Sequence, residues 1–399
     1  VKDGCSPQGQ CGCCTVLVDG QARVSCVTPV KRVIGREIET LEGLDDTLKN
    51  TWAKAFIDAG ASQCGFCTPG IIMRFAALQK SGEKTEIEKV KRSLHAHLCR
   101  CTGWQTILEA WDDFGNSEVA IENDKVSERA SIEGRTPQKI DFDTALGKGG
   151  FSADIAPSNC LIAVPDQLGG WSLGESLTEA RNASKKIQGR RTTVKAVPPI
   201  ELPTGDWDAV LRTNWVEPGY LETDSSWCEP GGEPSTPLAN GGAFGSKFES
   251  VAPSAARQLA DKYKRPVLVL LSREDSVHLG HKRPPIAGGV NKNGEGIIRV
   301  ARTPGIADAI NSVAPKIEVQ EIDLPGPITS SKVRAAGWAE AKILLCGAFG
   351  EVGTIISPDG SEASAEIDEK SINISVRCGE VLNETVLRSY CIGAAHMAW

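Results

Sequence analysis

The chain has 399 residues and a formal net charge of −7, with 40% apolar and 24% charged residues. This length suffices for two to four domains, and the composition predicts packed cores rather than wholesale disorder. Because the charge is negative and no basic run stands out, we expect neither nucleic acid nor a membrane surface as a partner. The sequence also has no uninterrupted apolar stretch of about 18 residues, the length that a membrane-spanning helix needs.

The first 62 residues contain a set of four cysteines, which are Cys5, Cys11, Cys14 and Cys26. Their Cys-x5-Cys-x2-Cys spacing, followed by a lone Cys, is close to the C-x4-C-x2-C…C of plant-type ferredoxins. The apolar run 15–18, the turn Asp19-Gly20 and a return strand over 23–29 predict a ferredoxin-like β-grasp sheet. Because Val1 lies inside the motif and is not Met, we expect this domain, 1–62, to lack its N-terminus.

Residues 63–115 contain a second set of four, which are Cys64, Cys67, Cys99 and Cys101. Thr68-Pro69 begins a predicted helix that closes at Ser81-Gly82. The capping box Thr85-x-x-Glu88 opens a second predicted helix that runs to Cys99, and a third follows Thr102-Gly103. The segment is therefore predicted to be a small helical bundle with its cysteines at helix ends.

The rest of the chain is predicted to be a polar linker over 116–145 and a mixed α/β domain over 146–399. Strands are expected at Cys160–Val164, Val267–Leu271 and Ile372–Val376, and helices at Ala255–Lys264 and Ala335–Leu345. The whole chain is therefore predicted to be an α+β multidomain protein.

Eight of the fourteen cysteines fall in the two sets, in spacings that suit metal better than disulfide pairing. Each set supplies the four thiolates of a 2Fe-2S cluster. Gly4, Gly9 and Gly12 permit the backbone angles of a loop wrapped round a cluster. Structural zinc is the alternative, since C-x2-C is also a zinc-ribbon spacing. All eight are therefore predicted metal ligands, and electron transfer is the first functional hypothesis.

The remaining cysteines are predicted not to bind metal. Cys13 is one thiol too many for the first set, so we expect it to be a bystander. The isolated cysteines are predicted to be buried, and they are Cys160, Cys228, Cys346, Cys378 and Cys391. Metal-type spacing instead of disulfide pairing predicts a reducing compartment, the cytoplasm.

Three segments resemble those of the molybdenum hydroxylases, the xanthine oxidase and aldehyde oxidoreductase family. Gln63-Cys-Gly-Phe-Cys-Thr-Pro-Gly70 and Leu98-Cys-Arg-Cys-Thr-Gly103 resemble the family's second-cluster signature, and Cys11–Gly20 resembles its first-cluster loop. The family usually has four residues between the first two ligands, whereas this chain has five. This departure removes no ligand.

The resemblance continues into the second half. Gly241-Gly-Ala-Phe-Gly-Ser-Lys247 is similar to the family's GGGFGxK loop, and Val333-Arg-Ala-Ala-Gly337 to its YRGAG segment. Tyr220–Thr223 and Cys378–Asn383 resemble further family segments. The resemblance implies a molybdopterin cofactor held by Gln63, Gly242, Ala243, Phe244, Gly245 and Arg334. It also implies that Arg334 is the catalytic cation facing the substrate pocket.

The resemblance implies hydroxylation of a heteroaromatic or aldehyde carbon with water-derived oxygen. The molybdopterin domain is shorter than the family's, and the late Gly-Glu segment that supplies the catalytic base is not recognisable. No flavin domain follows the linker, so we expect a small-molecule substrate, a separate flavoprotein or other electron acceptor, and an oligomer. The alternatives are an electron-transfer subunit with a non-catalytic remnant of the cofactor domain, and a zinc-stabilised interaction module.

Overall fold

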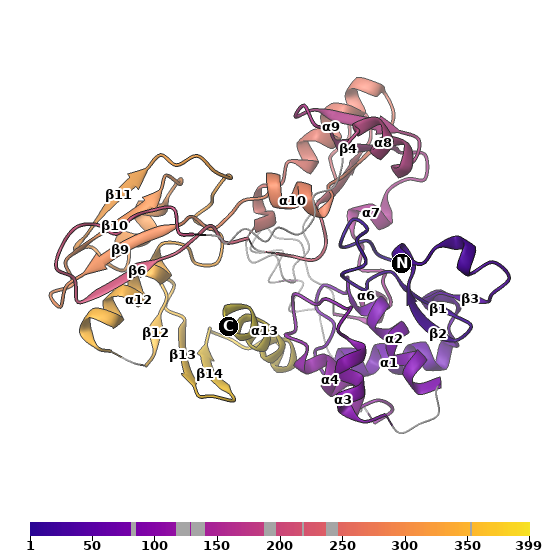
Figure 1. Ribbon diagram of the computed structural model, residues 1–399, viewed down its shortest axis with the longest axis horizontal. Coiled ribbons are helices and arrows are strands. Elements are labelled where there is room, and N and C mark those ends of the chain that lie inside the picture. The colour runs from indigo at the N-terminus through magenta and orange to yellow at the C-terminus, as the bar shows by residue number, and fades with distance from the viewer. Residues whose placement is uncertain are drawn as a thin grey trace.

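The computed structural model describes residues 1–80, 85–116, 128, 140–186, 197–217, 219–236, 246–351 and 353–399. Over these ranges the chain is a mixed α/β protein with several sheets. Figure 1 shows the N-terminal part, in indigo and purple, two further sheet-containing lobes, and the C-terminal helix, which returns to lie beside the N-terminal part. Among the described residues, no helix has both the length and the apolar character needed to cross a bilayer.

The first part contains a three-stranded antiparallel sheet in the order β2-β1-β3. Its strands are β1 Thr15–Val18, β2 Gln21–Val24 and β3 Ile38–Glu39. All four residues of β1 are buried, as the apolar run predicts. The return strand ends at Val24, so its predicted extension to residue 29 is wrong. Cys26 lies instead in the 3₁₀ turn Ser25–Val27, which bends it back towards the other cysteines.

Four helices follow, which are α1 Asp46–Asp58, α2 Thr68–Lys80, α3 Ile87–Ser93 and α4 Gln105–Asp112. The predicted start and end hold for α2, and so does the predicted start of α4 just after Gly103. For α3 they are wrong, because the helix ends at Ser93 and its N-cap, Glu86, makes no side-chain cap bond. The backbone beyond α3 does not continue the helix. The Leu98 N–H instead donates to the Cys11 carbonyl at 2.9 Å.

One hydrophobic core joins the sheet to these helices. Trp52 of α1 is fully buried and its ring stacks on Trp111 of α4 at 5.7 Å, with Phe75 of α2 at 5.1 Å. Leu17 of β1 belongs to the same core. The segments predicted as the domains 1–62 and 63–115 therefore share one packed interior, which fixes the two cysteine sets relative to each other.

Part of the predicted linker packs on this core. Ile140 and Ala145 are buried against Ala53 and Ile57 of α1. The short helix α6 Phe142–Ala145 begins at Asp141, whose side chain accepts the Thr144 N–H at 2.8 Å. Residues 117–127 and 129–139 of the predicted linker lie outside the described part of the chain.

The second lobe is built on a sheet in the order β5-β4-β8-β7, in which β4 and β8 run parallel. The strands are β4 Leu161–Pro165, β5 Trp171–Gly174, β7 Ser225–Cys228 and β8 Val267–Leu270. The helices are α7 Ser152–Ile155, α8 Leu177–Ser184, α9 Ala252–Tyr263 and α10 Arg273–Leu279. Ala256 and Leu259 of α9 pack on the sheet's buried residues, so the predicted strands and helix here are confirmed within a few residues.

The third lobe has a sheet in the order β11-β10-β9-β6, covered by two helices. Its elements are β6 Ala209–Arg212, β9 Ile286–Val290, β10 Gly296–Ala301, α11 Ile306–Asn311, β11 Ile317–Ile322 and α12 Trp338–Phe349. The predicted start of α12 at Ala335 is wrong, because Arg334 and Ala335 have positive φ angles of 52° and 56°.

The chain ends in the meander β12 Ile355–Ile356, β13 Glu362–Ile367 and β14 Ile372–Arg377, followed by α13 Glu384–Ala398. Of the cysteines predicted to be buried, Cys160 and Cys228 are buried, whereas Cys346 and Cys391 are half-buried. Cys378 is exposed in the turn after β14, so its predicted burial is wrong.

A buried ion cluster lies beside the start of the second lobe's strand β7. Lys247, which ends the Gly-rich motif, is 2% exposed, and its Nζ donates to Glu222 Oε2 at 2.5 Å. Asp224 Oδ1 lies 3.7 Å from the same Nζ. Burial raises the pKa of Glu222 to about 7, because the loss of hydration outweighs the attraction of Lys247.

This raised pKa gives a pH-dependent stability. In the unfolded chain a Glu ionises near its ordinary pKa of about 4.3, so the protonated carboxyl favours the folded state at low pH, and this contribution is lost as pH rises to about 7. We expect Glu222→Gln, which cannot ionise, to remove this decrease of stability with rising pH. The free energy of unfolding of the variant relative to wild type should rise by roughly 2–3 kcal/mol between pH 4.5 and 7.5.

Denaturant unfolding at a series of pH values measures this difference. Glu369→Gln, at an exposed position, is the control and should give a nearly constant difference. A difference that falls with pH would mean that the Lys247–Glu222 attraction exceeds the cost of burial.

Candidate metal centres

The four sulfurs of the first set lie together: Cys11 is next to Cys5 and also to Cys13, and Cys26 is next to Cys14. Cys26 is also close enough to Cys5 for their charges to interact. The neighbouring Cys11 thiol, followed by burial, raises the pKa of Cys5 well above its usual range. Burial and then Cys14 raise the pKa of Cys26 to about 12. Four crowded thiols ionise together only when a metal supplies positive charge.

The loop that carries these sulfurs is held by close backbone contacts. Gly12 has a φ of 70°, and a Cβ there would lie 2.4 Å from the Ala96 carbonyl oxygen. Gly9 also has a φ of 70°, with Val27 at 2.6 Å from the corresponding position. The Gln8 N–H donates to Cys5 Sγ at 3.1 Å. Such N–H···S bonds stabilise thiolate ligands and tune the reduction potential of a cluster.

The sulfurs of the second set form a continuous series of contacts in the order Cys64, Cys101, Cys99, Cys67. Cys101 Sγ lies 3.5 Å from Cys64 Sγ, and Cys67 is hydrogen-bonded to Cys99. Cys99 Sγ is in addition 3.1 Å from the Thr102 hydroxyl. Hydrogen bonds from Cys101 and Cys67 hold the pKa of Cys99 well below its usual range, and those of Cys67 and Cys101 are raised in turn.

The residues present fit two-iron clusters. A 2Fe-2S cluster takes four cysteine thiolates, and each set brings four cysteine sulfurs together. Over the described ranges, no group of three or more His, Cys, Asp or Glu side chains is placed to hold one metal ion. Cys13 is buried beside Cys11, to whose carbonyl its thiol donates at 3.7 Å, and its role as a bystander stays a prediction.

The two sets are in backbone contact with each other. The Leu98 N–H, next to Cys99, donates to the carbonyl of Cys11 at 2.9 Å. On the other side, a Cβ at Gly70 would lie 2.4 Å from the Gly12 carbonyl oxygen. Only glycine permits this approach, and it joins the loop of the first set directly to the segments that carry the second.

The C-terminal helix α13 covers part of the second set. Gln63 Nε2 donates to the Cys101 carbonyl at 3.1 Å and to Ser389 Oγ of α13 at 2.7 Å. Ser389 Oγ in turn donates to the Gly60 carbonyl at 2.6 Å. This buried chain links α13 to the backbone on both sides of the Cys64–Cys101 pair. The predicted contact of Gln63 with a pterin stays a prediction.

Small residues let α13 approach this closely. A Cβ at Gly393 would lie 1.8 Å from the Cys101 carbonyl oxygen, and Gly103 has His396 Cβ at 3.0 Å from its Cβ position. Arg388 makes a bidentate pair with Glu109 of α4 at 2.7 and 2.8 Å. These contacts join residues about 280 positions apart, and Figure 1 shows α13 beside α4.

The structure also brings Arg334 towards the second set. Its guanidinium is half-buried, and burial followed by Arg283 lowers its pKa. Arg100, between Cys99 and Cys101, has a pKa lowered to about 10 by burial and then by Arg334 and Arg273. The predicted catalytic cation thus lies within electrostatic reach of the second-cluster loop. Gly242, Ala243, Phe244 and Gly245 lie outside the described residues.

Sequence reasoning missed Ser389 and Gly393. A signal was available, because they lie four residues apart on one face of a helix, and small residues at that spacing permit close packing. Their partner could not be inferred, since nothing local connects residue 393 with Cys101.

Comparison with known proteins identifies residues 40–112 as a 2Fe-2S binding domain. The xanthine dehydrogenase iron-sulfur-binding subunit of Escherichia coli O157:H7 is 49% identical over 111 residues, which are 27% of this chain and 69% of that subunit. The nicotine 6-hydroxylase small subunit of Paenarthrobacter nicotinovorans is 44% identical over 110 residues, which cover 28% of this chain and 66% of its length. The aldehyde oxidoreductase of Megalodesulfovibrio gigas is 40% identical over 114 residues, only 12% of its length.

Two solved structures resemble most of the chain. The aldehyde oxidoreductase of Desulfovibrio desulfuricans superposes with a TM-score of 0.61 over 88% of this chain and 58% of its own, at 17% identity. That of Desulfovibrio gigas gives 0.59 over 86% and 56%, at 18% identity. At this identity the likeness concerns the fold, and it extends beyond the residues that match in sequence.

Replacement of a predicted ligand and replacement of the predicted bystander Cys13 should change the iron content differently. Cys64→Ser should lower the iron content from about four to about two atoms per chain and remove one of two reduced-cluster signals in electron paramagnetic resonance. The matched control Cys13→Ser should retain about four, because the other four sulfurs of the first set suffice for one cluster, although the Cys13 thiol contacts that of Cys11. Equal iron loss in both variants would show that Cys13 is a ligand.

The Ser389 hydroxyl should stabilise the second centre. Ser389→Ala leaves the Gly60 carbonyl without this donor and should lower the free energy of unfolding by about 1–3 kcal/mol. The resonance signal of one cluster should shift while the other is unchanged. Ser361→Ala, in the β12–β13 turn, is the control; the role fails if both variants leave both signals unchanged.

Proposed function

The chain belongs to the molybdenum hydroxylase family of the xanthine dehydrogenase and aldehyde oxidoreductase type, and on this premise we propose that it is an oxidoreductase that passes electrons through two 2Fe-2S clusters. When bound, each cluster would take up and release one electron. The observation that carries the proposal is the arrangement of eight buried or half-buried cysteines in two groups of four, on segments joined by the Leu98–Cys11 hydrogen bond.

The protein's own residues supply what such a relay needs. Backbone N–H groups, such as that of Gln8, reach the sulfurs and favour the charged state of the ligands. The shared core around Trp52 keeps the two sets at a fixed separation. Six of the eight cysteines are buried, which limits the exchange of electrons with solvent and favours exchange between the two centres.

We further propose a molybdopterin cofactor and the hydroxylation of a heteroaromatic or aldehyde carbon. Arg334 would stabilise the negative charge that develops on the substrate, since it is half-buried and close to Arg100 beside the second set. The likeness of fold to aldehyde oxidoreductases over 86–88% of the chain supports a cofactor-type domain. The matched length is only part of each relative, so the substrate class rests on family membership.

One observation favours a second function. Gln63, the residue expected to meet the pterin, already donates to Cys101 and to Ser389 of α13. A helix in this position suits an electron-transfer subunit whose cofactor domain is a non-catalytic remnant and which delivers electrons to a separate flavoprotein.

Metal analysis and spectroscopy of the full chain separate these functions. The proposal expects about four irons and four labile sulfides, bleaching of visible absorption on reduction, and molybdenum at about one atom per chain. Cluster signals without molybdenum would establish the electron-transfer subunit. Zinc in place of iron, with no visible absorption, would overturn both.

A further inference from the structure

A cavity of about 250 Å³ lies between the first cysteine set and the second lobe. One wall is the Ser6-Pro7 segment, next to Cys5. The opposite wall is formed by the ends of the parallel strands β4 and β8, at Pro165 and Leu270. Ligands of α/β proteins commonly bind outside the carboxyl ends of parallel strands.

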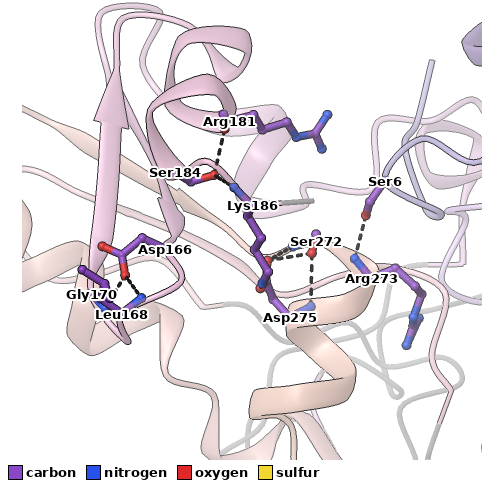
Figure 2. Close-up of polar contacts among 10 residues, drawn as sticks. All are labelled: Ser6, Asp166, Leu168, Gly170, Arg181, Ser184, Lys186, Ser272, Arg273 and Asp275. Atoms are coloured by element: carbon purple, nitrogen blue, oxygen red, sulfur yellow. Dashed lines mark hydrogen bonds and ion pairs between the residues drawn. The ribbon is translucent and has the colours of Figure 1, made fainter. Parts of the chain in front are cut away.

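The cavity has an apolar side and a charged side. Val164, Leu177, Leu270 and Leu271 form the apolar side. On the charged side, Figure 2 shows Lys186 reaching from the end of α8 towards Asp275 on α10, with which it forms an ion pair. Such a lining suits a mainly apolar ring system that carries one charged group.

Hydrogen bonds fix the side chains on the charged side of the cavity. Asp275 is 3% exposed, and its Oδ2 accepts the Ser272 hydroxyl at 2.7 Å and the Ser272 N–H at 2.8 Å. The bonds to Asp275 hold Lys186 in place at the cavity wall. Figure 2 also shows Ser6, whose hydroxyl accepts the Arg273 N–H at 2.6 Å, so α10 is tied to the first-cluster loop.

Arg181 of α8 supplies a second cation to the same wall. It lies 3.5 Å from Asp3, the limit of a hydrogen bond, and both side chains are partly exposed, at 34% and 42%. A guanidinium has five N–H donors, so this loose pair leaves donors for an anionic group entering the cavity. Among the described residues that line this cavity, the cations are Arg181 and Lys186 and the carboxylate is Asp275, which Lys186 neutralises. Arg181 is therefore the cation available to a ligand, although Asp3, from outside the lining, lies near it.

A second cavity of about 250 Å³ adjoins the first and shares Ser6, Leu177 and Arg181 with it. Its lining includes Phe66, which lies between Cys64 and Cys67, and Phe151, whose ring meets Phe66 edge-on at 5.3 Å. The space therefore passes residues next to both cysteine sets. A position beside both cysteine sets suits the exchange of electrons with a bound molecule.

We propose that this cavity binds a small aromatic electron acceptor with an acidic group, of the sulfonated or carboxylated quinone class, and that the proposed electron relay ends there. The inference rests on the proposed function, because the electrons come from the clusters. The quinone takes up two electrons, one from each reduced cluster, together with two protons from water, and leaves as the hydroquinone. Arg181 binds the acidic group, and the leucines pack on the ring.

Stopped-flow reoxidation of the full chain tests the proposal. The protein is reduced with dithionite under anaerobic conditions, freed of reductant and mixed with 1,4-naphthoquinone-2-sulfonate while the visible absorption returns. We expect a rate that saturates with quinone concentration. Arg181→Gln should raise the half-saturating concentration about 10-fold, the effect of one charge-assisted hydrogen bond.

Lys185→Gln is the matched control, because it makes the same charge change at an exposed neighbouring position that does not line the cavity. It should leave half-saturation within about 2-fold, and uncharged 1,4-naphthoquinone should hardly distinguish the variants. Leu177→Trp, which fills the cavity, should abolish saturation while the cluster spectrum is unchanged.

A linear dependence in wild type, or equal effects of Arg181→Gln and Lys185→Gln, would overturn the acceptor site. Binding of the sulfonate to the oxidised protein without faster reoxidation would do so too. Absence of cluster absorption before mixing would instead contradict the proposed function, so the two failures are distinguishable.

Discussion

The arrangement of the two cysteine sets depends on one backbone contact. The Gly12–Cys13 segment lies against Gly70 at the start of α2, and the Leu98 N–H closes the other side on the Cys11 carbonyl. The contact requires the absence of a Cβ at Gly70, and the absence of a Cβ at Gly12 lets the Ala96 carbonyl approach the same loop. Because both segments carry ligands within three residues, the contact sets the separation of the two centres directly.

Packing of the hydrophobic core stabilises this backbone contact. Trp52, Phe75 and Trp111 come from three helices, and their rings meet at 5.0–5.7 Å in a core that also holds Leu17 of the sheet. A small ferredoxin-like sheet of three short strands has too little apolar surface to be stable alone. The helices add the buried surface that the sheet lacks, and the two segments share one core.

The sequence predicts the local parts of this structure better than the long-range ones. Cysteine spacing and helix signals locate both sets, α2 and α4, because turns, caps and apolar periodicity act over a few residues. The early end of α3, the turn at Cys26 and the return of α13 depend on partners far along the chain. The pairing of Cys64 with Cys101 and the approach of Arg334 to Arg100 are of the same kind.

The two centres differ in what surrounds them, and for the proposed relay this difference favours one direction. The Cys64–Cys101 pair is covered by α13 through Ser389 and Gly393, which contact the chain's own backbone. The first set adjoins the proposed acceptor cavity through Ser6, next to Cys5, whereas Phe66, between Cys64 and Cys67, lines only the neighbouring cavity. A covered centre exchanges electrons with groups fixed in the protein, whereas a centre beside a cavity can meet molecules that come and go. Electrons would therefore enter at the second set and leave at the first.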